Sequence, residues 1–305
     1  MSGPGSPSLS VIIPCYYSTE TLGGCLAALE RQTLREFEVI VVNSSAEAAT
    51  ERLVRERHPE VRFLQSAVRL YPHEARNRGA ELARGELLVF TDPDCEAEPE
   101  WLAVLWDARR QGHEAIVGAM DLLRPSMWEQ GIHLLKFHWL LRGLSPGPKF
   151  CAATANAAYS RRLWERIGPF PQGYFAADGI LSFRAARAGS PPWFEPGAVV
   201  RHRHLIGGWE LCAQRFQRAR DYARAQLKLM YPGSWGARLR LLFSWSALPW
   251  VLIRAARDAF RCGWGKAYLL TLPVQTAGHA LWALGESCGA LETMVRRNKA
   301  RTGKP

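Results

Sequence analysis

The chain of 305 residues is 48% hydrophobic and 22% charged, which fits one large α/β domain, alone or with a helical appendage, and excludes a disordered polymer. Its net charge of +11 would suit a nucleic-acid-binding protein, but the charge is spread unevenly. Residues 1–200 carry 21 Lys and Arg against 23 Asp and Glu, whereas residues 201–305 carry 18 against 5. Because the basic third also holds the longest apolar runs, we expect an anionic membrane surface as a partner and no nucleic acid.

Neither the cysteines nor the N-terminus suggests secretion. No two of the seven cysteines have CxxC spacing, so the sequence predicts scattered thiols in a reducing compartment rather than a zinc site or a disulfide framework. Residues 1–8 lack the basic and apolar regions of a secretory signal, and we expect them to form a flexible lead-in.

Within the first hundred residues, buried strands alternate with helices. We expect strands over residues 9–14, 37–45, 61–66 and 86–94, and helices over residues 21–31, 46–57 and 74–85. Gly85 is predicted to end the last of these helices as its C′ residue. The alternation predicts an α/β fold with a mostly parallel sheet and helices on both faces. Ligands bind beyond the carboxyl ends of the strands in such sheets, here at residues 14–16, 43–45 and 92–94.

After residue 100, the sequence predicts more helices than strands. The pattern indicates a helix and a strand within 101–117, a helix over 128–142, a strand leading into a helix over 152–168, a helix over 176–188 and a basic helix over 210–230. Apolar residues interleave with the charges of the last helix, which favours an amphipathic helix resting on a membrane over a solvated one. They are Phe216, Tyr222, Leu227 and Leu229.

Two apolar blocks follow, over residues 241–253 and 267–285. A helix needs about 20 apolar residues to span a bilayer; the first block is too short, and Pro273, Gln275 and His279 interrupt the second. We therefore expect in-plane or re-entrant membrane helices, with one or two bilayer crossings and a soluble helical cap as alternatives. The expected interfacial residues are Trp245, Trp250, Trp264 and Trp282.

The tripeptide Asp92-Pro93-Asp94 is the strongest local signal. The chain has seven aspartates, none before residue 92, and two of them lie in this tripeptide. Mg²⁺ and Mn²⁺ prefer carboxylate oxygens and usually share their ligand shell with substrate phosphates. Asp and Pro are also ordinary turn residues, but their position after a buried strand of an α/β frame favours a divalent-metal site.

Three further positions are candidates for chemistry. Asp178 precedes an apolar-periodic helix, so it could be a helix N-cap or a catalytic base. His202 and His204, at i and i+2 after a predicted strand, would point to one side, where His202 could complete a metal shell or the pair could bind phosphate. Asp121, at a predicted strand end, could form a second site or lie on the surface.

Six segments in order resemble the motifs of inverting family 2 glycosyltransferases of the GT-A fold. The resemblance covers about residues 9–205. The segments are SVIIPCYY, the VIVVN strand end, ARNRGAELARGE, VFTDPDC, TANAAYSRRLWERIGPF and YFAADGILSFRAARAG.

This resemblance implies a role for each matching position. Pro14, Tyr16 and Asn43 would line the base pocket of a nucleotide-sugar donor, with Arg76 and Asn77 near the base or diphosphate. Asp92 would contact the ribose or the metal, and Asp94 and His202 the metal. Asn156 would face the sugar and acceptor, and Asp178 would be the catalytic base.

Two positions depart from the family pattern. Asn43-Ser44-Ser45 stands where the family usually has DDGS, so an acidic contact to the base is missing. Ala177-Asp178 stands where the family usually has a Glu-Asp pair, and the remaining carboxylate aligns with the catalytic base.

The sequence thus predicts a GT-A domain over residues 9–205 and a basic, membrane-associating helical region over 206–305, at the cytoplasmic face of a membrane. The expected reaction is a metal-dependent, inverting sugar transfer from a nucleotide sugar to a hydroxyl acceptor, lipid-linked or part of a surface glycan. A nucleotidyltransferase and a non-catalytic membrane scaffold are the alternatives. The loop CYYSTETLGG has no cation, which counts against the first.

Overall fold

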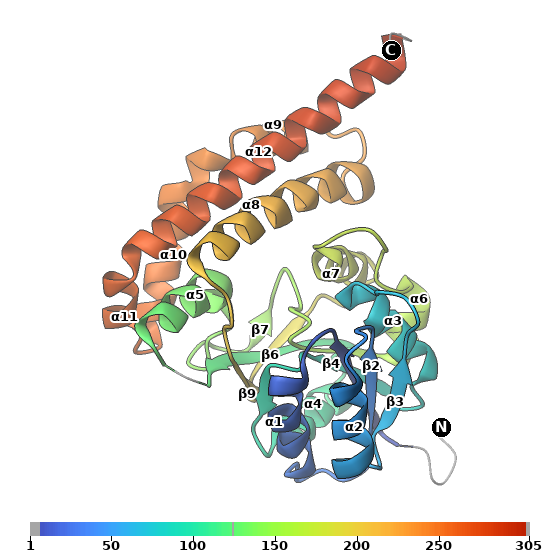
Figure 1. The fold of residues 1–305 in the computed structure, drawn as a ribbon. Helices are drawn as coiled ribbons and strands as arrows, with labels where there is room; N and C mark the ends of the chain where they lie inside the picture. Colours follow the sequence, from blue (N-terminus) through green and yellow to red (C-terminus); the bar gives the residue numbers. More distant parts are fainter. Residues whose placement is uncertain (1–6, 124, 303–305) are drawn as a thin grey trace. The chain divides into compact units, whose positions relative to one another are not determined.

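A computed structural model describes residues 7–123 and 125–302, with side chains described as far as Val295. Of the predicted lead-in, residues 1–6 lie outside the described residues. The described chain forms two compact units (Figure 1). The α/β unit contains residues 7–123, 140–172 and 177–203, and the helical unit contains residues 125–139, 173–176 and 204–302.

One mixed sheet organises the α/β unit. Its nine described strands are β1 (Leu9–Cys15), β2 (Phe37–Asn43), β3 (Arg62–Gln65), β4 (Leu87–Thr91), β5 (Cys95–Ala97), β6 (Ala115–Leu122), β7 (Gly147–Pro148), β8 (Asn156–Ser160) and β9 (Trp193–His202). They lie in the order β3-β2-β1-β4-β8-β6-β9-β5, with β7 paired to β9. The predicted α/β fold is confirmed.

Strands β1 to β4, β6 and β9 run in one direction, and β5, β7 and β8 run in the other. Strands β1 to β4 pair only in parallel among themselves, so their carboxyl ends share one edge of the sheet, as the sequence predicted. Strand β8 then runs antiparallel to both β4 and β6, and β5 and β7 run antiparallel to β9. Strand β6 pairs in parallel with β9, so the mostly parallel arrangement that the sequence predicted is confirmed for six of the nine described strands.

Helices of the α/β unit begin and end close to the predicted residues. They are α1 (Thr19–Glu30), α2 (Ala48–Arg57), α3 (Pro72–Leu82), α4 (Trp101–Arg110), α6 (Arg161–Ile167) and α7 (Ala177–Arg187). Pro72 opens α3, and the Glu74 carboxylate accepts a hydrogen bond from the Tyr71 N–H at 2.8 Å.

The predicted C′ role of Gly85 is wrong, because α3 ends three residues earlier, at Leu82. Gly85 is instead packed against strand β1. A Cβ atom at this position would lie 2.5 Å from the carbonyl carbon of Leu9 and 2.6 Å from the nitrogen of Ser10. The close approach of two backbones therefore requires glycine here.

The helical unit contains α5 (Met127–Phe137), α8 (Gly208–Ala225), a π-helical turn (Gln226–Met230), α9 (Trp235–Leu242), a 3₁₀ turn (Ser244–Ala247), α10 (Leu248–Arg261), α11 (Gly265–Leu270) and α12 (Leu272–Thr302). The apolar block predicted over 267–285 is broken at Thr271, whose side chain and backbone bond back to Ala267. A second predicted block, 241–253, is divided between α9, the 3₁₀ turn and α10.

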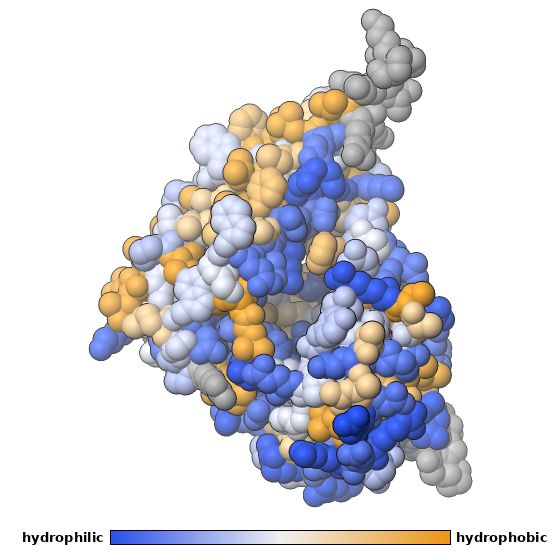
Figure 2. All heavy atoms as spheres, in the orientation of Figure 1, coloured by the Kyte–Doolittle hydropathy of each residue, from blue (hydrophilic) through white to orange (hydrophobic). Residues whose placement is uncertain are grey.

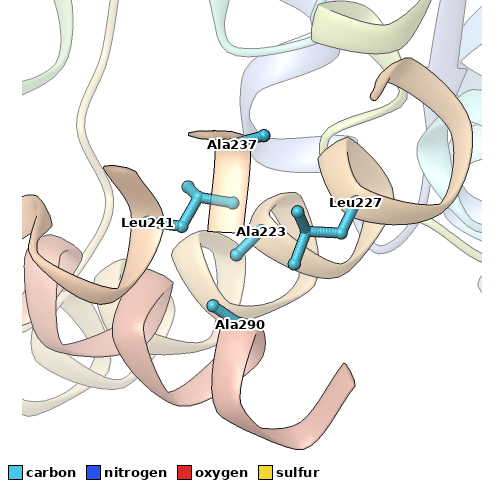
Figure 3. Packing of buried hydrophobic residues seen from close by; sticks show 5 residues of the cluster. All are labelled: Ala223, Leu227, Ala237, Leu241 and Ala290. Atoms are coloured by element: carbon cyan, nitrogen blue, oxygen red, sulfur yellow. The ribbon is translucent and has the colours of Figure 1, made fainter. Parts of the chain in front are cut away.

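Small residues let α8 and α12 pack closely. A Cβ atom at Gly289 would lie 2.3 Å from the carbonyl oxygen of Arg220 and 3.0 Å from the Ala223 Cβ, and Gly285 is equally close to α8. Figure 3 shows the adjoining cluster, in which side chains from α8, the π turn, α9 and α12 meet. It consists of Ala223, Leu227, Ala237, Leu241 and Ala290.

Among the residues predicted to face a membrane, Leu227 faces the interior of the unit instead. Leu227 is buried in the cluster, and the Tyr222 ring lies 6.4 Å from that of Trp282. Trp264 stacks on His133 with ring centroids 5.4 Å apart. Tyr222, Trp264 and Trp282 are only partly buried, so their contact with a membrane stays a prediction.

Candidate functional site

Arg76 and Asp92 form an ion pair at the carboxyl edge of the parallel strands. Asp92 follows β4 directly, and α3 brings the Arg76 guanidinium to it. Arg76 is 3% exposed, and its Nη1 lies 3.3 Å from His73 Nδ1. Its Nε has no hydrogen-bond partner within the described residues. A buried guanidinium with an unused donor at this edge suits a phosphate or a sugar oxygen.

Asp94 and His202 meet beside this pair. Strand β5 is antiparallel to β9, with Cys95 opposite His202, so the imidazole comes to Asp94. His202 Nε2 lies 3.6 Å from Asp94 Oδ2, and potential ligand atoms of Asp94, Cys95 and His202 all lie within 4.8 Å of one another.

The chemistry of these donors fits a divalent cation. Carboxylate oxygen suits Mg²⁺ and Mn²⁺, and imidazole suits softer first-row ions. Burial raises the pKa of the Cys95 thiol well above its ordinary value, and the Asp94 and Asp92 carboxylates raise it further. Thiolate is a soft ligand that suits Zn²⁺ or Cu⁺ better than Mg²⁺ or Mn²⁺, so Asp94 and His202 are the stronger ligand candidates for these ions.

His204 does not share the position of His202. The prediction that both point to one side assumed a strand through residue 204, but β9 ends at His202. His204 belongs to the helical unit, where its ring lies 5.7 Å from that of His133 and 6.1 Å from that of Phe137.

Aromatic and cationic side chains lie beyond β1. Pro14 is the sixth residue of β1, paired with Val42, and Tyr16 follows the strand with 41% of its surface exposed. The Arg69 guanidinium lies 4.6 Å above the Tyr16 ring and 5.7 Å from that of Tyr71. Such exposed planar groups can stack on a nucleobase.

The three predicted asparagines are buried and bonded to neighbouring groups. Asn43 donates to Gln65 Oε1 at 2.8 Å and accepts from the backbone and hydroxyl of Ser45, which closes the turn after β2. Asn77 donates to the Phe170 carbonyl at 2.9 Å and accepts from its N–H at 3.0 Å.

Asn156 is fully buried at the start of β8. Its amide donates to the carbonyls of Ala119 and Ala198, both at 2.8 Å, and accepts from the Trp101 indole at 2.8 Å. These bonds give Asn156 a structural role within the sheet, while its contact with a sugar stays a prediction.

Asp178 lies in the first turn of α7, one residue inside the helix rather than at its N-cap. Its Oδ1 accepts the Gly179 N–H at 2.8 Å, and its carbonyl accepts the Ser182 hydroxyl at 2.8 Å. The positive end of a helix stabilises a carboxylate there. Asp121, the other candidate, accepts the N–H of Leu122 within β6 at 2.8 Å.

The sequence profile described as glycosyl transferase family 2 matches residues 10–168, just over half of the chain. The chain belongs to this family. The match spans β1 to α6 and therefore includes Asp92 and Asp94. The protein is thus a family 2 glycosyltransferase, an enzyme with a GT-A fold.

Curated relatives agree with this assignment. "Glycosyltransferase AglE" from Haloferax volcanii is 27% identical over 64% of this chain and 67% of its own. The "Amylovoran biosynthesis glycosyltransferase AmsB" of Erwinia amylovora is 34% identical over 29% of this chain and 31% of its own length. The match to AmsB thus spans only about a third of that relative's length.

Solved structures share the fold. A mannosyltransferase from Pyrobaculum calidifontis, solved with GDP-Man and Mn²⁺, superposes with a TM-score of 0.60 over 96% of this chain and 88% of its own, at 22% identity. GalNAc-T7, solved with UDP, GalNAc and Mn²⁺, has a TM-score of 0.57 over 73% of this chain and 48% of its own, at 17% identity.

Sequence reasoning missed Arg69 and Tyr71. Both lie between β3 and α3, a segment with no strand end and no carboxylate to draw attention to it. The run Arg69-Leu70-Tyr71-Pro72 is a weak signal, because an aromatic next to a proline that opens a helix is common.

Proposed function

We propose that this family 2 glycosyltransferase moves a sugar from a nucleoside-diphosphate sugar to a hydroxyl group, with inversion and with a divalent metal. The observation that carries the proposal is the pairing of Asp94 with His202, 3.6 Å apart, beside the ion pair of the buried Arg76 with the partly exposed Asp92. Oxygen and imidazole donors next to a guanidinium suit a metal-bound diphosphate.

Asp94 and His202 would hold the metal, which would offset negative charge on the departing diphosphate. Arg76, paired with Asp92, would place its positive charge near the ribose or diphosphate of the donor. Tyr16, with Arg69 above it, would stack on the base. Two solved proteins of this fold carry GDP-Man or UDP together with Mn²⁺, which supports a donor of this class.

Asp178 would act as the base. The acceptor oxygen forms a bond to the anomeric carbon, the bond from that carbon to the phosphate oxygen breaks, and the hydroxyl proton passes to the Asp178 carboxylate. Attack from the face opposite the leaving group inverts the anomeric centre. The Gly179 N–H donates to Asp178 Oδ1 at 2.8 Å and so fixes the orientation of this carboxylate in the first turn of α7.

The acceptor proposed is lipid-linked or a growing surface glycan. One relative, from Campylobacter jejuni, is named "GalNAc(5)-diNAcBac-PP-undecaprenol beta-1,3-glucosyltransferase", and it is 25% identical over 37% of this chain. AmsB is named for amylovoran biosynthesis. Both names describe glycan assembly.

A thermal-shift panel tests the donor side. UDP-, GDP-, dTDP- and CDP-sugars are added with and without Mn²⁺, because a ligand that binds only the folded state raises its melting temperature. We expect one nucleotide class to stabilise the protein only with metal, and Asp94→Ala to abolish this stabilisation. Asp107→Ala is the matched control, since Asp107 is exposed on α4 and pairs only with Arg110 among the described residues.

Failure of every donor to shift folded protein would contradict the proposal and favour a scaffold. An equal loss in Asp94→Ala and Asp107→Ala would contradict the metal site. A shift that needs no metal would contradict only the metal dependence.

A further inference from the structure

Helix α10 (Leu248–Arg261) exposes apolar and basic side chains together on one face. Residues 250, 253, 257 and 260 recur at spacings of three and four, so they share a side of the helix. Trp250, Ile253 and Phe260 are 61%, 68% and 56% exposed. Ala255 and Ala259, on the opposite side, are fully buried within the unit. Trp250 and Ile253 therefore contribute little to the packing of the helical unit, whereas one side of the Phe260 ring packs against Gly265 of α11.

Three arginines border these apolar side chains, Arg254, Arg257 and Arg261, and all are exposed. In the described part of the chain no carboxylate pairs with them. The single acidic residue of α10, Asp258, bonds to His138 at 3.1 Å instead. Arg254 lies 5.4 Å above the Trp250 ring, so its stem covers the indole while its charge stays available.

The segments next to α10 in the chain also expose apolar side chains, one of them with an arginine above it. In α9, Trp235 and Leu239 are 62% and 49% exposed, and Arg238 lies 5.0 Å above the Trp235 ring. Trp245 of the 3₁₀ turn is 60% exposed. Figure 2 shows orange apolar patches among blue and pale ones over the helical unit.

We propose that the exposed face of α10, defined by Trp250, Ile253, Phe260, Arg254, Arg257 and Arg261, docks on an anionic lipid surface. Its apolar side chains enter the boundary between headgroups and acyl chains, while the arginines reach lipid phosphates. This surface lies in the helical unit, so the inference does not depend on the identity of the sugar donor.

Charge argues against a second copy of this chain as the occupant. A two-fold contact would bring the arginines of two α10 faces together, with no carboxylate on either face to offset them. The basic excess of residues 201–305, 18 Lys and Arg against 5 Asp and Glu, adds to the repulsion. An anionic bilayer complements both features of the face.

The helix lies in the membrane plane rather than across it. Within the described residues no single helix has the length and apolar composition for a crossing. The bent pair Trp235–Leu242 and Ser244–Arg261 meets that test only together, with a bend of 67°. If this pair crossed the bilayer, Arg254 and Arg257 would lie within the hydrocarbon core, which is costly.

Flotation of the full chain with vesicles tests the docking. Phosphatidylcholine vesicles are compared with vesicles containing 30% phosphatidylglycerol, at low and high salt. We expect binding to the anionic vesicles and its loss at high salt. Arg254→Gln/Arg257→Gln/Arg261→Gln weakens partitioning about 100-fold, at roughly fivefold for each arginine removed.

Matched variants distinguish the contribution of the α10 face from that of positive charge elsewhere on the protein. Arg52→Gln/Arg55→Gln/Arg57→Gln removes the same charge from exposed positions of α2 and leaves partitioning within a few-fold of wild type. Trp250→Ser/Phe260→Ser weakens binding at least tenfold, whereas Val68→Ser/Leu82→Ser, at exposed apolar positions of the α/β unit, does not. Circular dichroism and thermal melting of each variant verify folding.

Equal losses from the α10 and α2 triple variants would overturn the proposal, as would equal binding to both kinds of vesicle. Light scattering that shows a dimer disrupted by Trp250→Ser/Phe260→Ser, without vesicle binding, would assign the face to a second copy.

Discussion

The two units of this enzyme use charge in opposite ways. In the α/β unit, the site residues Arg76 and Asp92 neutralise each other, and Glu38 is shared by Arg62 and Arg84. In the helical unit, Glu292 pairs with Arg220 and Arg224, but the arginines of α10 have no such partner among the described residues. Paired charges fix a geometry within a unit, while unpaired charges of one sign attract something outside it. The following predictions, from the largest expected effect to the smallest, test the two units separately.

Asp178→Asn should lower the rate of sugar transfer by about 10²–10⁴-fold, because the amide cannot accept the acceptor proton. Donor binding in the thermal-shift assay should stay as in wild type. Asp107→Asn, a change of the same size on the exposed surface of α4, is the control. Full activity of Asp178→Asn would show that Asp178 is not the catalytic base.

Asn156→Ala should destabilise the α/β unit by about 3 kcal/mol or more, because it leaves the Trp101 indole and two carbonyls unpaired in the core. Hydrogen exchange should speed up in β6 and β8 and stay unchanged in α8 and α12. An equal increase in hydrogen exchange in both units would mean that the α/β and helical units unfold together, and it would contradict their description as separate units.

Gly289→Ala should destabilise the helical unit by about 1–3 kcal/mol, because the added methyl group meets the Arg220 carbonyl and forces α8 and α12 apart. Exchange should then increase in α8 and α12 alone. Gly236→Ala, where a Cβ meets only the Ser234 hydroxyl at 4.0 Å, is the matched control. A Gly289→Ala protein as stable as wild type would contradict the close packing.

Glu38→Gln should cost the α/β unit about 1–2 kcal/mol at neutral pH. Burial acts to raise the pKa of Glu38, but hydrogen bonds from Arg62, Arg84 and Ser10 outweigh it and hold the pKa below the ordinary 4.5. A lowered carboxyl pKa contributes stability above pH 4.5, and this contribution is lost as the pH falls through the folded-state pKa. The free energies of unfolding of wild type and Glu38→Gln, measured by denaturant melts, should therefore converge below pH 4.5. A difference that stays constant with pH would contradict the coupling between Glu38 protonation and stability.

Most of the fold around the site could be predicted because its signals are local. The runs 9–14 and 86–94 are apolar and β-branched, so their burial and their ends follow from the residues themselves. Asp92 and Asp94 were found for the same reason, since a strand that ends in two carboxylates needs no distant partner to be noticed. The short strand β5 was missed because its three residues, Cys95–Ala97, show no periodicity.

The helical unit was harder to predict for a physical reason. An apolar residue on a helix has the same pattern whether it faces a bilayer or another helix of its own unit. Leu227 and Trp250 look alike in sequence, yet Leu227 is 5% exposed in a cluster and Trp250 is 61% exposed. Only the packing of α8 on α12 separates them.

By itself, the sequence determined the alternation of strands and helices in the first hundred residues, the ligand-binding ends of β1, β2 and β4, and the two carboxylates at residues 92 and 94, because hydrophobic periodicity and strand ends are properties of neighbouring residues. The tertiary structure alone decided that His202 rather than His204 meets Asp94, that Arg69 covers Tyr16 and that Asn156 is bonded within the sheet. Each of these depends on which distant strands pair and in which register, and no short segment encodes that.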